Sequence, residues 1–263
     1  MSPAVRVHHI AEGPPDAPVL VLSSSLGTTL AMWEPQVEQL ARTFRVVRYD
    51  LRGHGASPVP PGPYEIADLG ADLLRLLDEL DVARAHLCGL SLGGMLSMWV
   101  AAHAPERVDR LVLCCTSAQL GPPEMWAQRA IKVLAEGTAS VAGPVVERWF
   151  TPGFAARQPE LVARLRAGMA ALSAAGYAAC CGVVERLNLL DDLARIRAPT
   201  LALAGADDLA IPPKHAYRIA AGITGCRVEV VADAAHLANI EQPTAVTALI
   251  MEHLGGPSAE DER

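Results

Sequence analysis

Aromatic side chains and positive charge are both scarce in this sequence. Aromatic residues make up 4% of the 263 residues, and 22 Lys and Arg are outnumbered by 29 Asp and Glu, for a net charge of −7. A nucleic-acid surface needs a basic face, so this charge balance argues against one. No stretch reaches the roughly 20 consecutive apolar residues that a membrane-spanning helix requires. We therefore expect a small-molecule ligand, without nucleic-acid or membrane partners.

Cysteine motifs are also missing. The chain has six cysteines, but they form no CxxC pair and no spacing typical of a zinc site or of a disulfide framework. Their apolar neighbours favour small core residues in a reducing compartment. The first residues, MSPAVRVHHIAEG, lack the basic-then-apolar pattern of a signal peptide. We predict a cytoplasmic protein that holds no metal.

Short apolar runs alternate with helical patterns along most of the chain. A sequence that is 51% hydrophobic can bury a large core. Helical spacing occurs at residues 66–80, 92–104 and 243–254. Continuous apolar runs suit strands buried on both faces, so the alternation predicts an α/β fold: a mostly parallel central sheet with helices on both faces. The predicted strands are residues 19–22, 44–49, 85–89, 111–115, 200–204 and 227–231.

One long stretch, residues 122–190, breaks the alternation because it has helical spacing and no convincing strand. A connection of this length is far outside the usual loop range. We predict an inserted helical cap here, over the end of the sheet that carries the chemistry. The alternative is two or three ordinary packing helices. The core would then comprise residues 1–121 and 191–254, followed by a flexible, acidic tail at 255–263.

The pentapeptide Gly89-Leu90-Ser91-Leu92-Gly93 is a G-x-S-x-G motif between a predicted strand and a predicted helix. The motif makes a turn so tight that the serine has a strained backbone and its hydroxyl points out of the sheet. Glycines two residues before and after avoid collisions with neighbouring backbone. The pattern alone is weak, and the alternative is a glycine-rich turn with an idle serine. Its position favours Ser91 as a nucleophile.

A serine hydroxyl needs a base, and the base needs an orienting carboxylate. When the serine lies on a strand-to-helix turn of this kind, the acid follows it in the sequence and the histidine comes last. Asp207 and Asp208 follow the strand at residues 200–204; adjacent side chains diverge, and we predict Asp208 as the acid. His236 follows the last strand and precedes the last helix, so we predict it as the base. The other histidines lie in predicted strands, helices or a glycine loop.

The loop LSSSLGT at residues 22–28 follows the first clear strand. A carbonyl oxygen that becomes negative during acyl transfer needs two donors already in place. We predict the backbone N–H groups of Leu26 and Leu92 as these donors, with Gly27 allowing close approach of the backbone. The alternative is a simple Ser/Gly turn.

These residues resemble the α/β-hydrolase superfamily over nearly the whole chain. Within it, the chain is most similar to the 3-oxoadipate enol-lactonases of the protocatechuate (β-ketoadipate) pathway. That resemblance is carried by SSSLGTTLAMWEPQV, FRVVRYDLRGHGAS, CGLSLGG, RWFTPGF and AHLANIEQP. The Ser-Leu-Gly loop differs from the HG-rich loop of related esterases, and enol-lactonases share this difference. The resemblance implies lactone ring opening without a cofactor. Some family members are fused to a carboxymuconolactone decarboxylase, so GGPSAEDER could be a remnant linker.

The substrate that this family implies carries a carboxylate, which a net-negative protein must bind with local cations. The predicted cap supplies Arg129, Lys132 and Arg148, beside Trp126 and Trp149, and an arginine suits a carboxylate best. For any one of these cations, the alternative is a solvated surface charge. Trp33 could line the pocket or belong to the core.

Two other functions use the same scaffold. A general esterase or cofactor-free perhydrolase (haloperoxidase) would use the same three residues with a different pocket. A non-catalytic ligand receptor is disfavoured by the intact Ser-Asp-His set. The sequence leaves the physiological lactone and homo-oligomer formation open.

Overall fold

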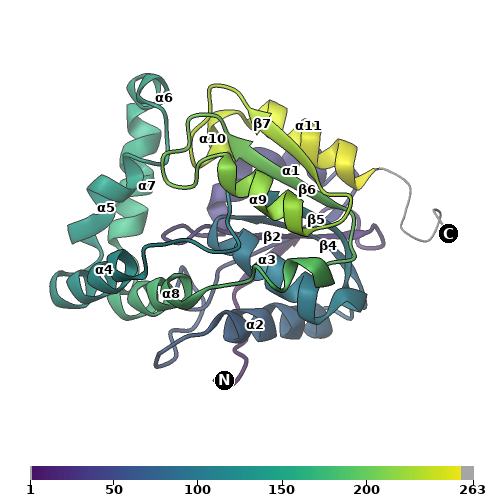
Figure 1. The fold of residues 1–263 in the computed structure, drawn as a ribbon, viewed down its shortest axis with the longest axis horizontal. Coiled ribbons are helices and arrows are strands. Elements are labelled where there is room, and N and C mark those ends of the chain that lie inside the picture. The colour runs from purple at the N-terminus through teal and green to yellow at the C-terminus, as the bar shows by residue number, and fades with distance from the viewer. Residues whose placement is uncertain (1, 256–263) are drawn as a thin grey trace.

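A seven-stranded sheet forms the centre of the molecule in the computed structural model, which describes residues 2–255 (Figure 1). The strand order is β1-β3-β2-β4-β5-β6-β7. β1 is antiparallel to β3, and every other neighbouring pair is parallel. The mostly parallel α/β sheet predicted from the sequence is therefore confirmed. The strands are β1 (His9–Glu12), β2 (Val19–Ser23), β3 (Arg45–Tyr49), β4 (Ala85–Leu90), β5 (Val108–Cys114), β6 (Thr200–Gly205) and β7 (Arg227–Val231).

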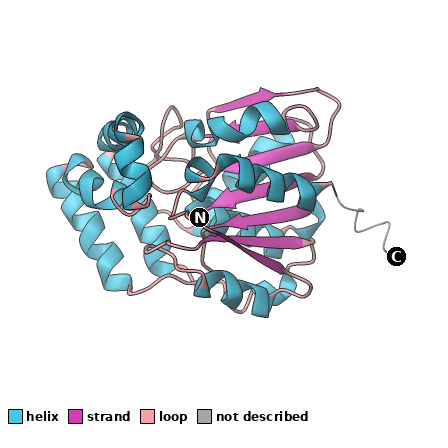
Figure 2. Cartoon of the chain, turned by 90° about the horizontal axis from the view of Figure 1, so that it is seen from above, coloured by secondary structure: helices cyan, strands magenta, loops and turns pink. Residues whose placement is uncertain are grey.

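The central strands are buried because helices cover both faces of the sheet (Figure 2). Every residue of β4 and β6 is buried, as their continuous apolar sequences require. α3 lies beneath β2, β4 and β5 and contacts α2, while α1 and α11 contact each other, and α11 packs on β5. The covering helices are α1 (Glu34–Leu40), α2 (Ile66–Glu79), α3 (Leu92–His103), α9 (Lys214–Gly222), α10 (Ala238–Glu241) and α11 (Pro243–Leu254), with 3-10 turns at Leu30–Trp33, Pro105–Arg107 and Leu193–Arg195.

Five helices without an intervening strand connect β5 to β6 and form the helical cap (Figure 1). α4 packs along α8, and α5 packs against α7. Figure 1 shows this group beside the sheet rather than on either of its faces. The division of the chain into separately folding units at residues 122 and 190 stays a prediction. The cap helices are α4 (Pro123–Glu136), α5 (Ala139–Val146), α6 (Pro152–Arg157), α7 (Pro159–Ala170) and α8 (Ala174–Arg186).

In the described part of the chain, no single helix has both the length and the apolar character needed to cross a membrane. α7 and α8 pass that test only when taken together, and they are bent by 95° at their junction. Of the predicted flexible tail, residues 256–263 lie outside the described residues.

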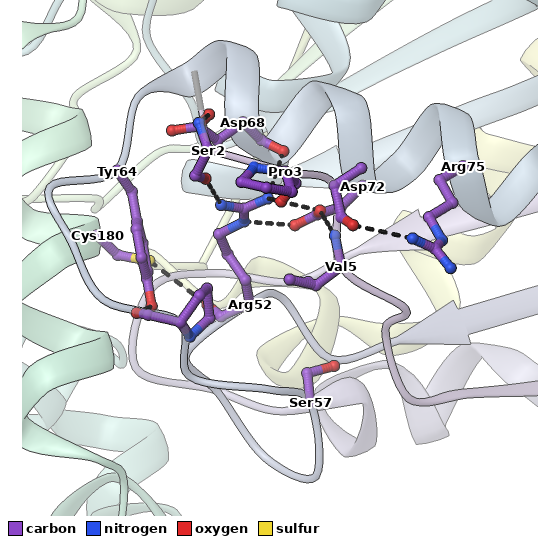
Figure 3. A network of polar contacts seen from close by, with 12 residues as sticks. Ser2, Pro3, Val5, Arg52, Ser57, Tyr64, Asp68, Asp72, Arg75 and Cys180 are labelled. Carbon is purple, nitrogen blue, oxygen red and sulfur yellow. Dashed lines mark hydrogen bonds and ion pairs between the residues drawn. The ribbon is translucent and has the colours of Figure 1, made fainter.

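A buried ion pair ties the loop after β3 to α2 and to the start of the chain (Figure 3). The Arg52 side chain is fully buried, and its guanidinium donates two hydrogen bonds to the Asp72 carboxylate, at 2.5 and 2.6 Å. The same guanidinium donates to the Asp68 carbonyl and to the hydroxyl of Ser2. This bidentate geometry satisfies charges that would otherwise be costly to bury. The loop after β3 is thereby fixed to the helix layer.

Candidate active site

Ser91 stands at the junction of β4 and α3, in the backbone conformation that the motif predicts. Its φ of 57° lies in the left-handed region, which non-glycine residues rarely adopt. The glycines around it are required by space. A Cβ on Gly89 would lie 2.2 Å from the Gly93 carbonyl oxygen, and one on Gly93 would lie 2.1 Å from that of Ser23. The strand-to-helix turn therefore closes only with these small residues.

His236 and Asp208 come together at the carboxyl end of the sheet. Asp208 follows β6, His236 follows β7, and His236 Nδ1 lies 2.8 Å from Asp208 Oδ2. The other carboxylate oxygen accepts backbone N–H bonds from Ala210 and Ile211, at 2.8 and 2.9 Å. Because the carboxylate accepts a hydrogen bond from Nδ1–H, Nε2 of the neutral imidazole is left as a proton acceptor. Asp207, by contrast, is exposed.

One pocket is lined by both Ser91 and His236 and has a volume of about 230 Å³. Leu26 and Ser25 form part of its wall, and so does the loop at residues 209–211 that follows Asp208. The cap closes the pocket with side chains from α4, α5, α8 and the segment after α5. A site of this size suits a small molecule rather than a polymer chain.

The predicted oxyanion donors belong to the helix that follows Ser91 and to the loop after β2, which lines the same pocket. Leu92 is the first residue of α3, where a backbone N–H has no partner inside the helix. Leu26 belongs to the loop after β2, and the next residue, Gly27, has a φ of 88°. The Gly27 N–H donates to Nε2 of the buried His54, at 3.1 Å. Burial lowers the pKa of His54, which keeps this nitrogen free to accept the bond.

Two of the three predicted cations face the pocket. Arg129 and Arg148 both line it, and the Arg129 guanidinium lies 4.4 Å from the centre of the Trp126 ring. Partial burial lowers the pKa of Arg148, and the nearby Arg129 charge lowers it further. Two cations held side by side favour an anionic ligand between them. Trp149 is buried and also lines the pocket.

Lys132 and Trp33 lie elsewhere, and we do not retain them in the substrate-binding set. Lys132 is exposed on α4, 4.0 Å from Glu136, whereas the inward side of this helix carries the buried Trp126 and Val133. Trp33 is fully buried in the core and is not part of the pocket wall.

Two further polar groups belong to the pocket wall: Tyr177 is not predicted from the sequence, and Trp126 is predicted only as a neighbour of the cap cations. The Tyr177 hydroxyl and the Trp126 indole N–H are buried, and neither donates a hydrogen bond to another described residue; the Tyr177 oxygen interacts with the Arg129 guanidinium. Both residues line the pocket. Burial raises the pKa of Tyr177 far above its ordinary value. Buried donors normally have partners, so these two are available to a ligand. Helical spacing in α4 and α8 gives no sign of which aromatic residues face inward.

Within residues 2–255, no cluster of three or more His, Cys, Asp or Glu side chains is placed to hold a metal ion. The pocket wall consists instead of apolar groups with a few convergent polar ones. Such a site can position a small acyl substrate against a serine hydroxyl and an imidazole.

Comparisons with known proteins agree with this arrangement. The family model for the alpha/beta hydrolase fold matches residues 18–243. The chain is 39% identical over 241 residues to 3-oxoadipate enol-lactonase 2 of Acinetobacter baylyi, a match that covers 92% of this chain and 90% of the relative. The crystal structure of the enol-lactonase from Burkholderia xenovorans superposes with a TM-score of 0.93 at 40% identity, covering 95% of this chain and 96% of the other.

A hydrolase of known structure from Pseudomonas aeruginosa is 46% identical, with a TM-score of 0.92 and coverage of 95% and 94% of the two chains. These matches span nearly the whole sequence, and the residues matched by the family model include Ser91, Asp208 and His236. The chain belongs to the α/β-hydrolase fold family, as a carboxylic ester hydrolase.

Proposed function

We propose that this enzyme opens the lactone ring of 3-oxoadipate enol-lactone, with Ser91 as nucleophile, His236 as base and Asp208 as the orienting acid. The observation that carries the proposal is a single pocket. It is lined by the serine hydroxyl, by an imidazole bonded at 2.8 Å to a buried carboxylate, and by two arginines. The 39% sequence identity to a 3-oxoadipate enol-lactonase, over nine-tenths of the length of both chains, supports the same substrate.

The reaction begins when His236 takes the proton of Ser91 and the serine oxygen attacks the lactone carbonyl. The N–H groups of Leu26 and Leu92 stabilise the negative oxygen that results. Collapse of this intermediate breaks the ring C–O bond and expels an enolate oxygen, which His236 protonates. The enol tautomerises to the ketone, so reversal is disfavoured. Water activated by His236 then releases the acid and restores Ser91.

Substrate selection rests on the cap. The carboxylate of the substrate would lie between Arg129 and Arg148. The Tyr177 hydroxyl and the Trp126 N–H would donate further hydrogen bonds to the same carboxylate. An unpaired buried donor is costly, so a ligand that satisfies both groups gains affinity over one that does not. This lining favours an acidic lactone over a neutral ester of the same size.

The cysteines are all unpaired, which supports the proposed cytoplasmic location.

The test is an ultraviolet assay of enol-lactone loss, run beside p-nitrophenyl acetate and a peroxide-dependent halogenation assay. We expect enol-lactone to have the highest kcat/KM. Ser91→Ala should lower turnover by about 10⁴- to 10⁶-fold, as in other enzymes of this type. Turnover of esters or peroxide without turnover of enol-lactone would instead indicate a general esterase or a perhydrolase. Near-normal activity of Ser91→Ala would exclude the mechanism.

A further inference from the structure

The loop that carries His236 is held by a buried carboxylate outside the proposed catalytic triad. Glu241, the last residue of α10, is 6% exposed. Its Oε2 accepts the backbone N–H of Ala235, at 2.9 Å. Its Oε1 accepts the hydroxyl of Thr151 and, at 3.2 Å, the Thr151 backbone N–H. One carboxylate therefore joins the residue before His236 to the first turn of α6 in the cap.

A second bond fixes the other side of the histidine. The N–H of Leu237 donates to the carbonyl of Trp149, at 2.9 Å. His236 is thus flanked by two hydrogen bonds: that of Leu237 goes directly to Trp149, and that of Ala235 goes to Glu241, whose carboxylate in turn binds Thr151. The same segment begins with Trp149, which lines the pocket. The position of the proposed base is consequently set by the cap as well as by Asp208.

The free energy needed to bury the Glu241 carboxylate indicates that this residue has a specific role. All the contacts described for the Glu241 carboxylate come from N–H and O–H donors. Burying a carboxylate is unfavourable, and neutral donors compensate for it only when their geometry is well fixed. A neutral side chain would close the α10 turn at lower cost. What the carboxylate adds is a simultaneous hold on two segments, 90 and 6 residues away in the sequence.

We propose that Glu241 is a positioning residue, which aligns the His236 imidazole with Ser91 by locking the histidine loop to the cap at Thr151. It touches neither the substrate nor the reacting atoms. The inference rests on the proposed function only in taking Ser91 and His236 as nucleophile and base. A misplacement of about 1 Å at a reacting group can cost on the order of 100-fold in rate.

The experiment compares four variants with the wild-type enzyme. Glu241→Ala removes both ties, and Glu241→Gln keeps an acceptor for Ala235. Thr151→Val removes the hydroxyl that donates to Glu241, and with it the acceptor of the Phe154 N–H at the start of α6. Thr247→Val is the matched control, because it deletes a buried hydrogen bond of 2.7 Å to the Pro243 carbonyl in α11, away from the pocket. For each variant we would measure the melting temperature, kcat and KM, and the rate of Ser91 labelling by diisopropyl fluorophosphate, a reagent too small to depend on the cap cations.

We expect Glu241→Ala to lower kcat and the labelling rate on the order of 100-fold, with KM changed less than about threefold. Glu241→Gln should recover most of this loss. Thr151→Val should lower kcat in the wild-type background but add nothing in Glu241→Ala, because the two groups form one contact. Thr247→Val should change the melting temperature without changing kcat.

Labelling of Glu241→Ala at the wild-type rate, or a fall in melting temperature with kcat unchanged, would overturn the proposal. If Glu241→Ala does not fold, Thr151→Val decides: a lower labelling rate in the folded variant supports the proposal, and an unchanged rate refutes it. A wild-type enzyme that diisopropyl fluorophosphate does not label would instead contradict the proposed function. The two ideas can therefore fail separately.

Discussion

Each of the two carboxylates in the Asp207–Asp208 pair has a different environment, although the residues are adjacent. Asp208 is 2% exposed, and its two oxygens are occupied by His236 Nδ1 and by two backbone N–H groups of its own loop. The side chain of Asp207 is exposed, and its backbone N–H donates to the Ala234 carbonyl. A carboxylate fixed in this way holds the imidazole in one tautomer at little further cost in entropy.

Replacing Arg129 should separate acidic from neutral substrates. Arg129→Ala removes a cation from the pocket wall, and a hydrogen bond to a charged group contributes roughly 1.5–3 kcal/mol. We expect KM for enol-lactone to rise about 10- to 100-fold, and KM for p-nitrophenyl acetate to stay within about twofold. Steady-state kinetics on both substrates is the measurement.

Lys132→Ala is the matched control for that experiment. It removes a cation from the same helix, three residues further on, whose side chain is paired with Glu136 outside the pocket. Its kinetics should match those of the wild-type enzyme. Equal increases in KM on both substrates for Arg129→Ala would exclude a role in carboxylate binding.

Single residues of the site can be predicted from the sequence where both the residue type and its position in the chain order fit the chemistry. The G-x-S-x-G motif predicts Ser91, and positions directly after predicted strands predict Asp208 and His236. The structure places these three residues at one end of the sheet. Tyr177 cannot be assigned in this way, because the face of a cap helix that looks inward depends on tertiary packing. The same uncertainty explains why the sequence groups Lys132 with the pocket cations.

Among the structural elements, the turn between β4 and α3 is the most constrained. Gly93→Ala would place a Cβ 2.1 Å from the Ser23 carbonyl oxygen, which is backbone and cannot easily move. We expect a loss of about 3 kcal/mol in the free energy of unfolding, or no folded protein. Urea denaturation would measure it.

Gly168→Ala provides the comparison in a helix with open space. Beyond the backbone of α7 itself, a Cβ at Gly168 would meet no heavy atom of the described residues within 4 Å. Alanine should therefore be neutral or stabilising by up to about 1 kcal/mol at this position. A Gly93→Ala variant as stable as Gly168→Ala would contradict the steric account of the motif.

Most strands could be predicted, including the half-exposed β7 at residues 227–231, whereas the pairing of β1 and the short helix α1 could not. The buried strands β2, β4 and β6 begin within a residue of their predicted positions. β1 has four residues, HIAE, none of them fully buried, and its antiparallel direction depends on where the chain returns to pair with β3. α1 has seven residues and a proline in its first turn, too short for a periodic signal.

For the molecule as a whole, buried histidines should make stability depend on pH. Burial lowers the pKa of His54, His86 and His253 below the usual value of about 6.5. Below that value the unfolded chain takes up protons that the folded chain does not, so stability is lost as pH falls. We expect the free energy of unfolding to decrease between pH 7.5 and 5.5, by up to about 1.4 kcal/mol for a fully buried histidine.

His54→Gln tests the origin of this dependence. Glutamine can still accept the Gly27 N–H but does not titrate, so the variant should show a shallower fall in stability over the same pH range. Urea denaturation at several pH values would record it. An identical slope in the variant and the wild-type enzyme would remove His54 from the explanation.

β5 and β6 are neighbours in the sheet, with Leu111 paired to Thr200, yet the entire cap lies between them in the sequence. The polypeptide thus leaves and rejoins the core at adjoining strands, roughly 5 Å apart. The proposed substrate selection by Arg129 and Arg148 therefore depends on the inserted segment, while Ser91, Asp208 and His236 belong to the rest of the chain. A cap grafted from another hydrolase would have to reproduce the anchor at Thr151 if the recipient's own Glu241 is to keep both of its contacts.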